Sequence, residues 1–186
     1  SDEARAEKLV ESMRFFDRNA MIFPAKDVLF YYADVHGNAT AKKRLAVMKR
    51  ICSDEPTVIV TTVDGLMDRL PDLKYFKAHT FSLSVGDSID LDQLKADLTM
   101  EGYENVPEVE TSGQFSVRGG ILDIFPLTEE CPLRVEFFGD EIDSIREFDV
   151  ESQRSISELE HFLIFPASEY VLSEERKARG LARIEK

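Results

Sequence analysis

Two arginines and one phenylalanine on a pair of predicted strands have the residue types and spacing of a protein-binding surface. Residues 114–118 and 133–138 both alternate apolar and polar side chains, as half-buried strands do. The alternation puts Arg118 on the polar face of the first strand, and Arg134 and Phe138 on the polar face of the second. Arginine beside an exposed aromatic ring is typical of interface hot spots, because both bring contact area and arginine adds paired hydrogen bonds.

A structural interpretation fits the same three residues equally well. Phe138 would then fold under a neighbouring loop, and the arginines would only neutralise nearby acids. The two interpretations differ in the position of one ring, which is exposed on the sheet in the first and sealed in the interior in the second.

The negative charge of the chain is concentrated in its middle. The 186 residues carry a formal net charge of −13. Residues 79–168 hold 5 Lys and Arg against 20 Asp and Glu, whereas residues 1–78 hold 13 against 12 and residues 169–186 hold 5 against 4. A block this acidic repels nucleic acid, whose binding depends on Lys and Arg. The charge therefore favours a protein partner, although acidic surfaces also serve solubility.

The sequence lacks a phosphate-binding loop, in which glycines are followed by Lys and then Ser or Thr. The run 37–42 resembles part of one, but no glycine precedes Lys42, and Lys43 stands where the hydroxyl residue belongs. No cofactor is expected in this chain.

Metal and nucleophile sites are not indicated either. His36, His79 and His161 stand apart, without the spacing of metal ligands. The acids at 140, 141 and 143 could hold a divalent cation, but a solvated turn explains them better. No nucleophile motif occurs, so no catalytic residue is assigned and the chain is predicted not to be an enzyme.

Residues 1–78 follow the pattern of an α/β segment. Residues 4–18 and 42–52 have the composition and apolar spacing of helices, and the β-branched run 57–62 is typical of a buried strand in a parallel sheet. Asp64 is expected to cap a short helix that continues through Leu70. Only one or two strands are visible, so most of this sheet is expected to be missing.

Residues 79–168 are expected to form a small strand-rich α+β domain. A strand at 81–85 leads to Asp90, which is expected to cap a helix that stops at Gly102. The apolar alternation changes parity at Gly119 and Gly120, which predicts a β-bulge there.

The sequence also gives expectations for the C-terminal segment and for the cellular compartment of the protein. Residues 169–186 are predicted to form a C-terminal helical return segment. The sequence has no apolar run of about 18 residues and no signal-peptide pattern. Cys52 and Cys131 lie far apart without a C-x-x-C pattern. These features favour a cytoplasmic protein without membrane association, and the start at Ser1 suggests a piece of a longer chain.

Several runs in the strand region form a longer recognisable pattern. They are residues 113–126 (GQFSVRGGILDIFP), 134–146 (RVEFFGDEIDSIR), 152–155 (SQRS) and 165–169 (FPASE). Together they resemble the bacterial transcription-repair coupling factors, in the part homologous to the excision-repair protein UvrB. The resemblance covers about residues 20–172.

The resemblance implies that residues 79–168 are the small inserted module with which UvrB binds the repair protein UvrA. It implies that residues 1–78 belong to a partial RecA-like α/β domain, and that Arg118, Arg134 and Phe138 contact UvrA. The ATP-hydrolysing motor and the parts that contact DNA and RNA polymerase would lie elsewhere in the longer protein. The ATP site of UvrB is not carried over, because the start of its phosphate loop has no counterpart here.

The expected function is therefore that of an adaptor fragment, which binds UvrA and recruits nucleotide excision repair to stalled RNA polymerase. The alternative hypothesis is a nucleotide- or DNA-binding fragment of an ATP-dependent, helicase-like DNA translocase. Titrations with ATP and with a short duplex would distinguish the two.

Overall fold

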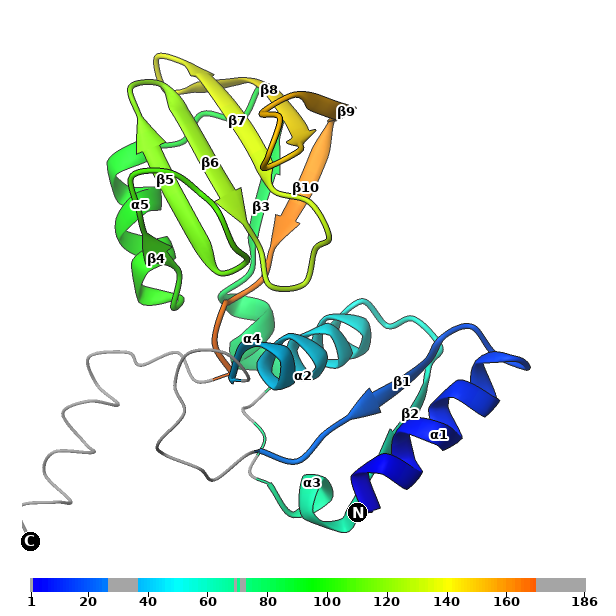
Figure 1. The fold of residues 1–186 in the computed structure, drawn as a ribbon. Coiled ribbons are helices and arrows are strands. Elements are labelled where there is room, and N and C mark those ends of the chain that lie inside the picture. The colour runs from blue at the N-terminus through cyan, green and yellow to red at the C-terminus, as the bar shows by residue number, and fades with distance from the viewer. Residues whose placement is uncertain (1, 27–36, 69, 71–72, 170–186) are drawn as a thin grey trace, which may run out of the picture. The chain divides into compact units, whose positions relative to one another are not determined.

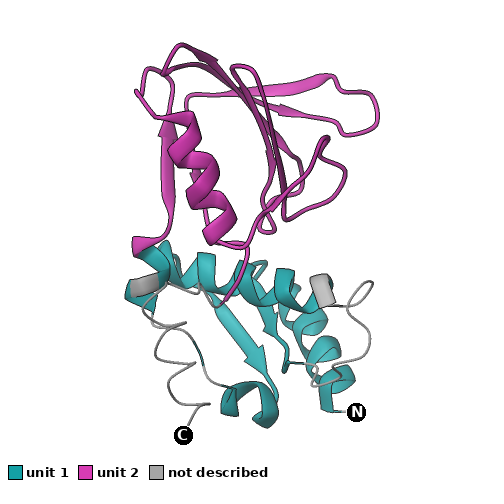
Figure 2. Ribbon diagram, turned by 90° about the vertical axis from the view of Figure 1, so that its left-hand side faces the viewer, with its two compact units in different colours: residues 1–77 teal, residues 78–186 magenta. Residues whose placement is uncertain are grey.

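The computed structural model describes residues 2–26, 37–68, 70 and 73–169. The chain divides into two compact units, Ser1–Lys77 and Ala78–Lys186 (Figure 2). Helices and strands are mixed in both units, as the sequence predicts. The helix expected within 169–186 lies outside the described residues, apart from Glu169.

Unit 1 has a parallel sheet of two described strands together with helices (Figure 1). Its elements are α1 (Asp2–Arg14), β1 (Ala20–Phe23), α2 (Gly37–Cys52), β2 (Val58–Thr61), α3 (Val63–Met67) and α4 (Leu73–Ala78). β1 and β2 pair in parallel, with Ala20 opposite Val58. Ala6 and Val10 on one face of α1 are buried together with Ala20 and Ile22 of β1, so the apolar stripe of the helix packs on the sheet.

The strand predicted at 57–62 is present and parallel, but it is not buried as expected. Ile59 is partly exposed, and β1 is the partner of β2 within the described ranges. Parallel strands are normally covered on both faces by further elements. The partial exposure of β2 follows from the small size of the described sheet.

The helix after β2 is capped by Thr62, so the prediction for Asp64 was wrong. Thr62 has extended backbone angles (φ −88°, ψ 167°), and its hydroxyl accepts a hydrogen bond from the Gly65 N–H at 3.2 Å. The helix also ends at Met67 and not at Leu70. Asp68 leaves the helical conformation and forms an ion pair at 2.9 Å with Arg44, whose side chain is buried.

Unit 2 combines the helix α5 with two sheets (Figure 1). Its elements are β3 (Phe81–Ser84), α5 (Leu91–Met100), β4 (Glu104–Asn105), β5 (Gln114–Arg118), β6 (Ile121–Phe125), β7 (Leu133–Phe138), β8 (Glu141–Phe148), β9 (Ser155–Leu159) and β10 (His161–Ile164). Six strands form one sheet in the order β4-β5-β6-β7-β8-β9, which is antiparallel apart from the β4–β5 pair. β3 and β10 form a separate antiparallel pair.

The core of unit 2 lies on one face of the six-stranded sheet. Fully buried side chains from four neighbouring strands form it: Phe115, Leu122, Ile124, Leu133, Val135, Ile142 and Ile145. Leu94 and Leu98 of α5 are buried as well, and Figures 1 and 2 both show α5 beside this sheet. Burying such a side chain contributes about 1.5–3 kcal/mol. The core thus fixes which face of β5, β6 and β7 carries their polar residues.

Asp90 caps α5 as predicted. Its Oδ1 accepts hydrogen bonds from the N–H groups of Asp92 at 2.9 Å and Gln93 at 3.1 Å. Gly102 follows the helix with φ +93°, a left-handed conformation that ends helices and suits glycine.

Gly119 and Gly120 form the turn of a tight hairpin, so the predicted β-bulge was wrong. Arg118 is directly opposite Ile121, and β5 and β6 pair antiparallel along their length. Gly119 has φ +61°, and a Cβ on Gly120 would lie 2.8 Å from the carbonyl oxygen of Phe137. Glycine lets the chain reverse within two residues here. The change of apolar parity is therefore the effect of a turn.

The two ends of unit 2 are held together within the unit. Phe81 at the start of β3 is opposite Ile164 at the end of β10. Glu101 accepts a hydrogen bond from the Ala167 N–H at 3.0 Å, and its carboxylate lies 2.5 Å from Nδ1 of His79. These contacts join the first and the last described segments of unit 2. None of the described helices is both long and apolar enough to cross a membrane.

Candidate protein-binding surface

Arg118, Arg134 and Phe138 lie on the sheet face opposite the apolar core, and we call them the arginine–phenylalanine surface. In the sheet register, Ser116 is opposite Asp123, and Asp123 is opposite Arg134. Residues directly opposite each other share a face, as do residues two apart on one strand. Arg118 therefore shares a face with Arg134, and Phe138 follows on the same side of β7. The two arginines point to one side, as the alternation predicts.

Asp123 joins the two arginines. Its carboxylate accepts hydrogen bonds from Arg134 Nε at 2.7 Å, from Arg134 Nη2 at 2.9 Å and from Arg118 Nη2 at 3.1 Å. Asp123 is buried, and its carboxylate is paired with both cations. Charge-assisted bonds of this kind are about twice as strong as neutral ones. Asp123 is not among the residues predicted from the sequence, although an acid in the middle of the apolar run 121–125 is a visible signal.

The guanidinium of Arg134 is held on several sides. Besides Asp123, it donates from Nη2 to Oε1 of Gln153 at 2.9 Å, and it lies 4.5 Å above the centre of the Phe148 ring. Hydrogen bonding to Asp123 raises the pKa of Arg134, and desolvation by burial offsets part of that rise. The side chain is 22% exposed. Arg134 is therefore a fixed charge with one accessible edge.

Arg118 and Phe138 are the exposed members of the surface. The side chain of Arg118 is 52% exposed, and the described bond to Asp123 uses Nη2. Phe138 is 85% exposed, so the ring is not sealed under a loop and the structural interpretation of Phe138 was wrong. A large apolar side chain that stays in water loses the free energy that burial would give it. It is available for a partner.

The neighbouring acid on β7, Glu136, is bound to residues of β8. Glu136 lies between Arg134 and Phe138 in the sequence, and its Oε2 accepts a hydrogen bond from the Ser144 hydroxyl at 3.1 Å. Its Oε1 lies 3.6 Å from Nη1 of Arg146. Arg118 and Arg134 are two of the five basic residues in the acidic block 79–168, and the nearby carboxylates of Glu136 and Glu108 also help to raise the pKa of Arg134. A few basic residues on an acidic surface can orient a partner of complementary charge as it approaches.

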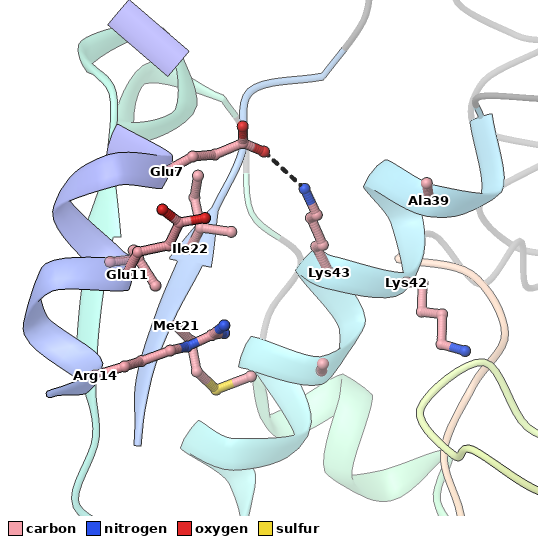
Figure 3. Close-up of a pocket in the computed structure, with 10 residues that line it drawn as sticks. Glu7, Glu11, Arg14, Met21, Ile22, Ala39, Lys42 and Lys43 are labelled. Atoms are coloured by element: carbon pink, nitrogen blue, oxygen red, sulfur yellow. Dashed lines mark hydrogen bonds and ion pairs between the residues drawn. The ribbon is translucent and has the colours of Figure 1, made fainter. Parts of the chain in front are cut away.

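Unit 1 contains a hollow of ≈570 Å³ between α1 and α2, and it does not have the features of a phosphate site. Figure 3 shows Glu7, Glu11 and Arg14 on α1, Met21 and Ile22 on β1, and Lys42 and Lys43 on α2. Lys43 Nζ is paired with Glu7 Oε1 at 3.0 Å, and Glu11 adds further negative charge. Residues 37–42 are helical, whereas a phosphate loop needs backbone N–H groups turned into a cradle.

The other sequence candidates for metal chemistry are separate in space. His79 pairs with Glu101, and His161 shares a hydrogen bond of 3.1 Å with the hydroxyl of Ser84. His36 lies outside the described residues. Across the part of the chain that the structure describes, no group of three or more His, Cys, Asp or Glu could hold a metal ion.

Comparison with known proteins adds an independent finding. Residues 81–170 match the family described as "UvrB interaction domain", a range that contains the whole arginine–phenylalanine surface. The chain is 37% identical over 169 residues to a transcription-repair-coupling factor of Bacillus subtilis, a match that covers 91% of this chain and 14% of that protein. A Staphylococcus aureus protein of the same name is 35% identical over 173 residues, with 92% of this chain and 15% of that protein covered.

The chain thus spans about one seventh of the length of the curated relatives that it matches. The resemblance drawn from the strand runs is confirmed. The matched family is an interaction domain, which agrees with the prediction that this chain is not itself an enzyme.

Proposed function

Residues 81–170 of this chain match the UvrB interaction domain family, and from this premise we propose that the chain binds the repair protein UvrA through its arginine–phenylalanine surface. One observation carries the proposal. Phe138 is 85% exposed on the same sheet face as two arginines that share a single carboxylate. This arrangement combines an apolar anchor with directed charge, which is the composition of an interface hot spot.

The exposed ring and the half-exposed cation define what the partner must offer. Phe138 requires an apolar pocket, and Arg118 requires a carboxylate beside that pocket, because its remaining N–H groups are donors only. Arg134 supports this contact as a fixed charge next to Arg118. Losing a central anchor of this kind typically costs about 2 kcal/mol or more, which is roughly 30-fold in affinity.

In the longer protein, this binding would recruit nucleotide excision repair to RNA polymerase stalled at a lesion. Contacts with RNA polymerase and DNA, and ATP hydrolysis by a motor, belong to parts outside this chain. Unit 1 fits a piece of a RecA-like domain in its parallel β1–β2 pair and flanking helices. In this proposal it belongs to the domain whose sequence the binding module interrupts.

The alternative function, nucleotide or DNA binding by this fragment, receives less support. Residues 79–168 carry 5 basic against 20 acidic residues, and counterion release from nucleic acid requires the opposite balance. Titrations of the chain with ATP and with a short duplex at low salt test this alternative. Saturable micromolar binding of either ligand would favour it.

A calorimetric titration of UvrA into the chain tests the proposal. Phe138→Ala and Arg118→Ala are each expected to weaken binding by roughly 30-fold or more. Ile156→Ala and Lys95→Ala are matched controls, because both residues are exposed in unit 2 and lie outside the surface. Equal affinity in all four variants would reject the surface.

A further inference from the structure

Asp123 is a buried acid on the sheet face that carries the two arginines. It lies at the centre of β6 with Ser116 opposite on one side and Arg134 on the other. An ion pair in such a position is not the most stabilising solution, since well-packed apolar residues of similar volume often do as well or better. A role in holding the arginines explains an acid here more directly.

The bonds to Asp123 fix the direction of both guanidinium groups. The Asp123 carboxylate accepts hydrogen bonds from Nε and Nη2 of Arg134 and from Nη2 of Arg118. Among the described residues, these bonds and the bond to Gln153 do not use Nη1 of either arginine, and its N–H groups remain donors for a partner. Arginine side chains normally lose much conformational freedom when they bind. Two arginine side chains that are already ordered in the free chain lose less conformational freedom on binding.

A turn after β8 supports the same arrangement from another direction. Gln153 accepts the second bond from Arg134 Nη2 at 2.9 Å. Its backbone has φ +56°, a conformation that is costly for a residue with a side chain. The turn is held by bonds from the Gln153 N–H to the Asp149 carbonyl at 2.8 Å and from Gln153 Nε2 to the Val150 carbonyl at 2.9 Å.

We propose that Asp123 is a positioning residue for UvrA binding, which acts with Gln153 to hold Arg118 and Arg134 as one preorganised pair. The inference rests on the proposed function and deepens it. Neither Asp123 nor Gln153 contacts the partner in this account. Their effect on affinity passes through the two arginines, and Phe138 contributes independently of them.

The test is a set of UvrA titrations with Asp123→Asn, which removes the charge and keeps the shape. The expected result is a loss of about tenfold or more in affinity, the effect of a lost hydrogen bond to a charged group. On an Arg118→Ala, Arg134→Ala background, Asp123→Asn is expected to have no further effect. On a Phe138→Ala background it is expected to have its full effect. A loss that is equally large on both backgrounds would mean that Asp123 acts through general structure, and would overturn the proposal.

Gln153→Ala provides a second variant, because it removes one bond to Arg134 and leaves Asp123 in place. We expect a smaller loss of affinity than for Asp123→Asn, with the same dependence on the arginine background. In an NMR spectrum, the Nε–H signal of Arg134 is expected to be slow to exchange with water in the unmodified chain, and to exchange faster in Asp123→Asn. Unchanged exchange would contradict the positioning role without any reference to UvrA.

The outcomes also distinguish this inference from the function on which it rests. If Phe138→Ala binds UvrA normally, the proposed surface fails. If Phe138→Ala loses binding while Asp123→Asn and Gln153→Ala retain it, the surface stands and only the positioning role fails.

Discussion

Arg134 and Asp123 face each other across β7 and β6 and are joined by two parallel hydrogen bonds, Nε to Oδ1 at 2.7 Å and Nη2 to Oδ2 at 2.9 Å. The fork of the guanidinium matches the two oxygens of the carboxylate, and this match fixes the plane of the cation. A buried acid and a largely buried cation thus form a rigid base for the exposed Arg118 and Phe138.

Replacing Arg134 by Lys is expected to destabilise the chain by about 1–3 kcal/mol. Lysine keeps the charge but cannot form both bonds to the buried Asp123. Arg118→Lys is the matched control and is expected to change stability by about 0.5 kcal/mol or less, because that side chain is half exposed. Urea unfolding of the two variants measures the difference. A larger loss for Arg118→Lys would contradict the assigned roles.

The hairpin turn before β6 gives a second prediction about stability. Gly120→Ala is expected to be more destabilising than Gly119→Ala, because the new Cβ would lie 2.8 Å from the Phe137 carbonyl oxygen in a backbone that cannot easily move. At Gly119 no atom lies within 4 Å, and the cost is the left-handed φ of +61°, about 1–2 kcal/mol for a residue with a side chain. Thermal unfolding ranks the two variants, and the reverse order would show that the turn is not built in this way.

Salt is expected to weaken UvrA binding through the arginines and not through Phe138. Raising NaCl from about 0.05 M to about 0.5 M shortens the screening length several-fold, which reduces the attraction between Arg118 and an acid of the partner. Arg118→Ala should therefore show a flatter dependence of affinity on salt, whereas Phe138→Ala should keep the slope of the unmodified chain. Identical slopes in Arg118→Ala and the unmodified chain would argue against a charged contact at this position.

The contact between Glu101 and His79 predicts a dependence of stability on pH. Burial raises the pKa of Glu101 above its usual value of 4.5, although the hydrogen bond from His79 lowers it in part. A carboxyl group with a raised pKa in the folded state contributes stability that is present below its unfolded pKa and is lost as pH rises through the folded value. The unfolding free energy of the chain relative to Glu101→Gln is therefore expected to fall as the pH rises above the usual range of a carboxyl group. Urea unfolding of both proteins at several pH values measures this difference, and a constant or rising difference would contradict it.

The sequence was sufficient for features that depend on local pattern. The alternation in β5 and β7 correctly placed Phe115, Leu133 and Val135 in the core, and Arg118 and Phe138 on the exposed face. Asp90 was identifiable as a cap because its carboxylate binds N–H groups only two and three residues away. Signals of this kind act within a few residues, so they do not depend on the rest of the fold.

The features that were missed depend on long-range pairing. Asp123 lies beside Arg118 because the chain reverses at Gly119 and Gly120, and beside Arg134 because it reverses again between β6 and β7. The predicted bulge at the first turn would make β5 and β6 one continuous strand. Asp123 could then not be recognised as a carboxylate that both arginines share. Gln153 reaches Arg134 from 19 residues away through a turn with an unusual backbone angle. The cap at Thr62 was missed because Thr62 and Asp64 are both good capping residues, and the end of β2 at Thr61 decides between them.

Photo-crosslinking from position 138 tests the central claim most directly. A photoreactive phenylalanine analogue is placed at Phe138 or, as a control, at Ile156, and each protein is irradiated with UvrA. The account predicts a crosslink to UvrA from position 138 and none from position 156. A crosslink from position 156 alone, or none from position 138 under conditions where UvrA is bound, would contradict it.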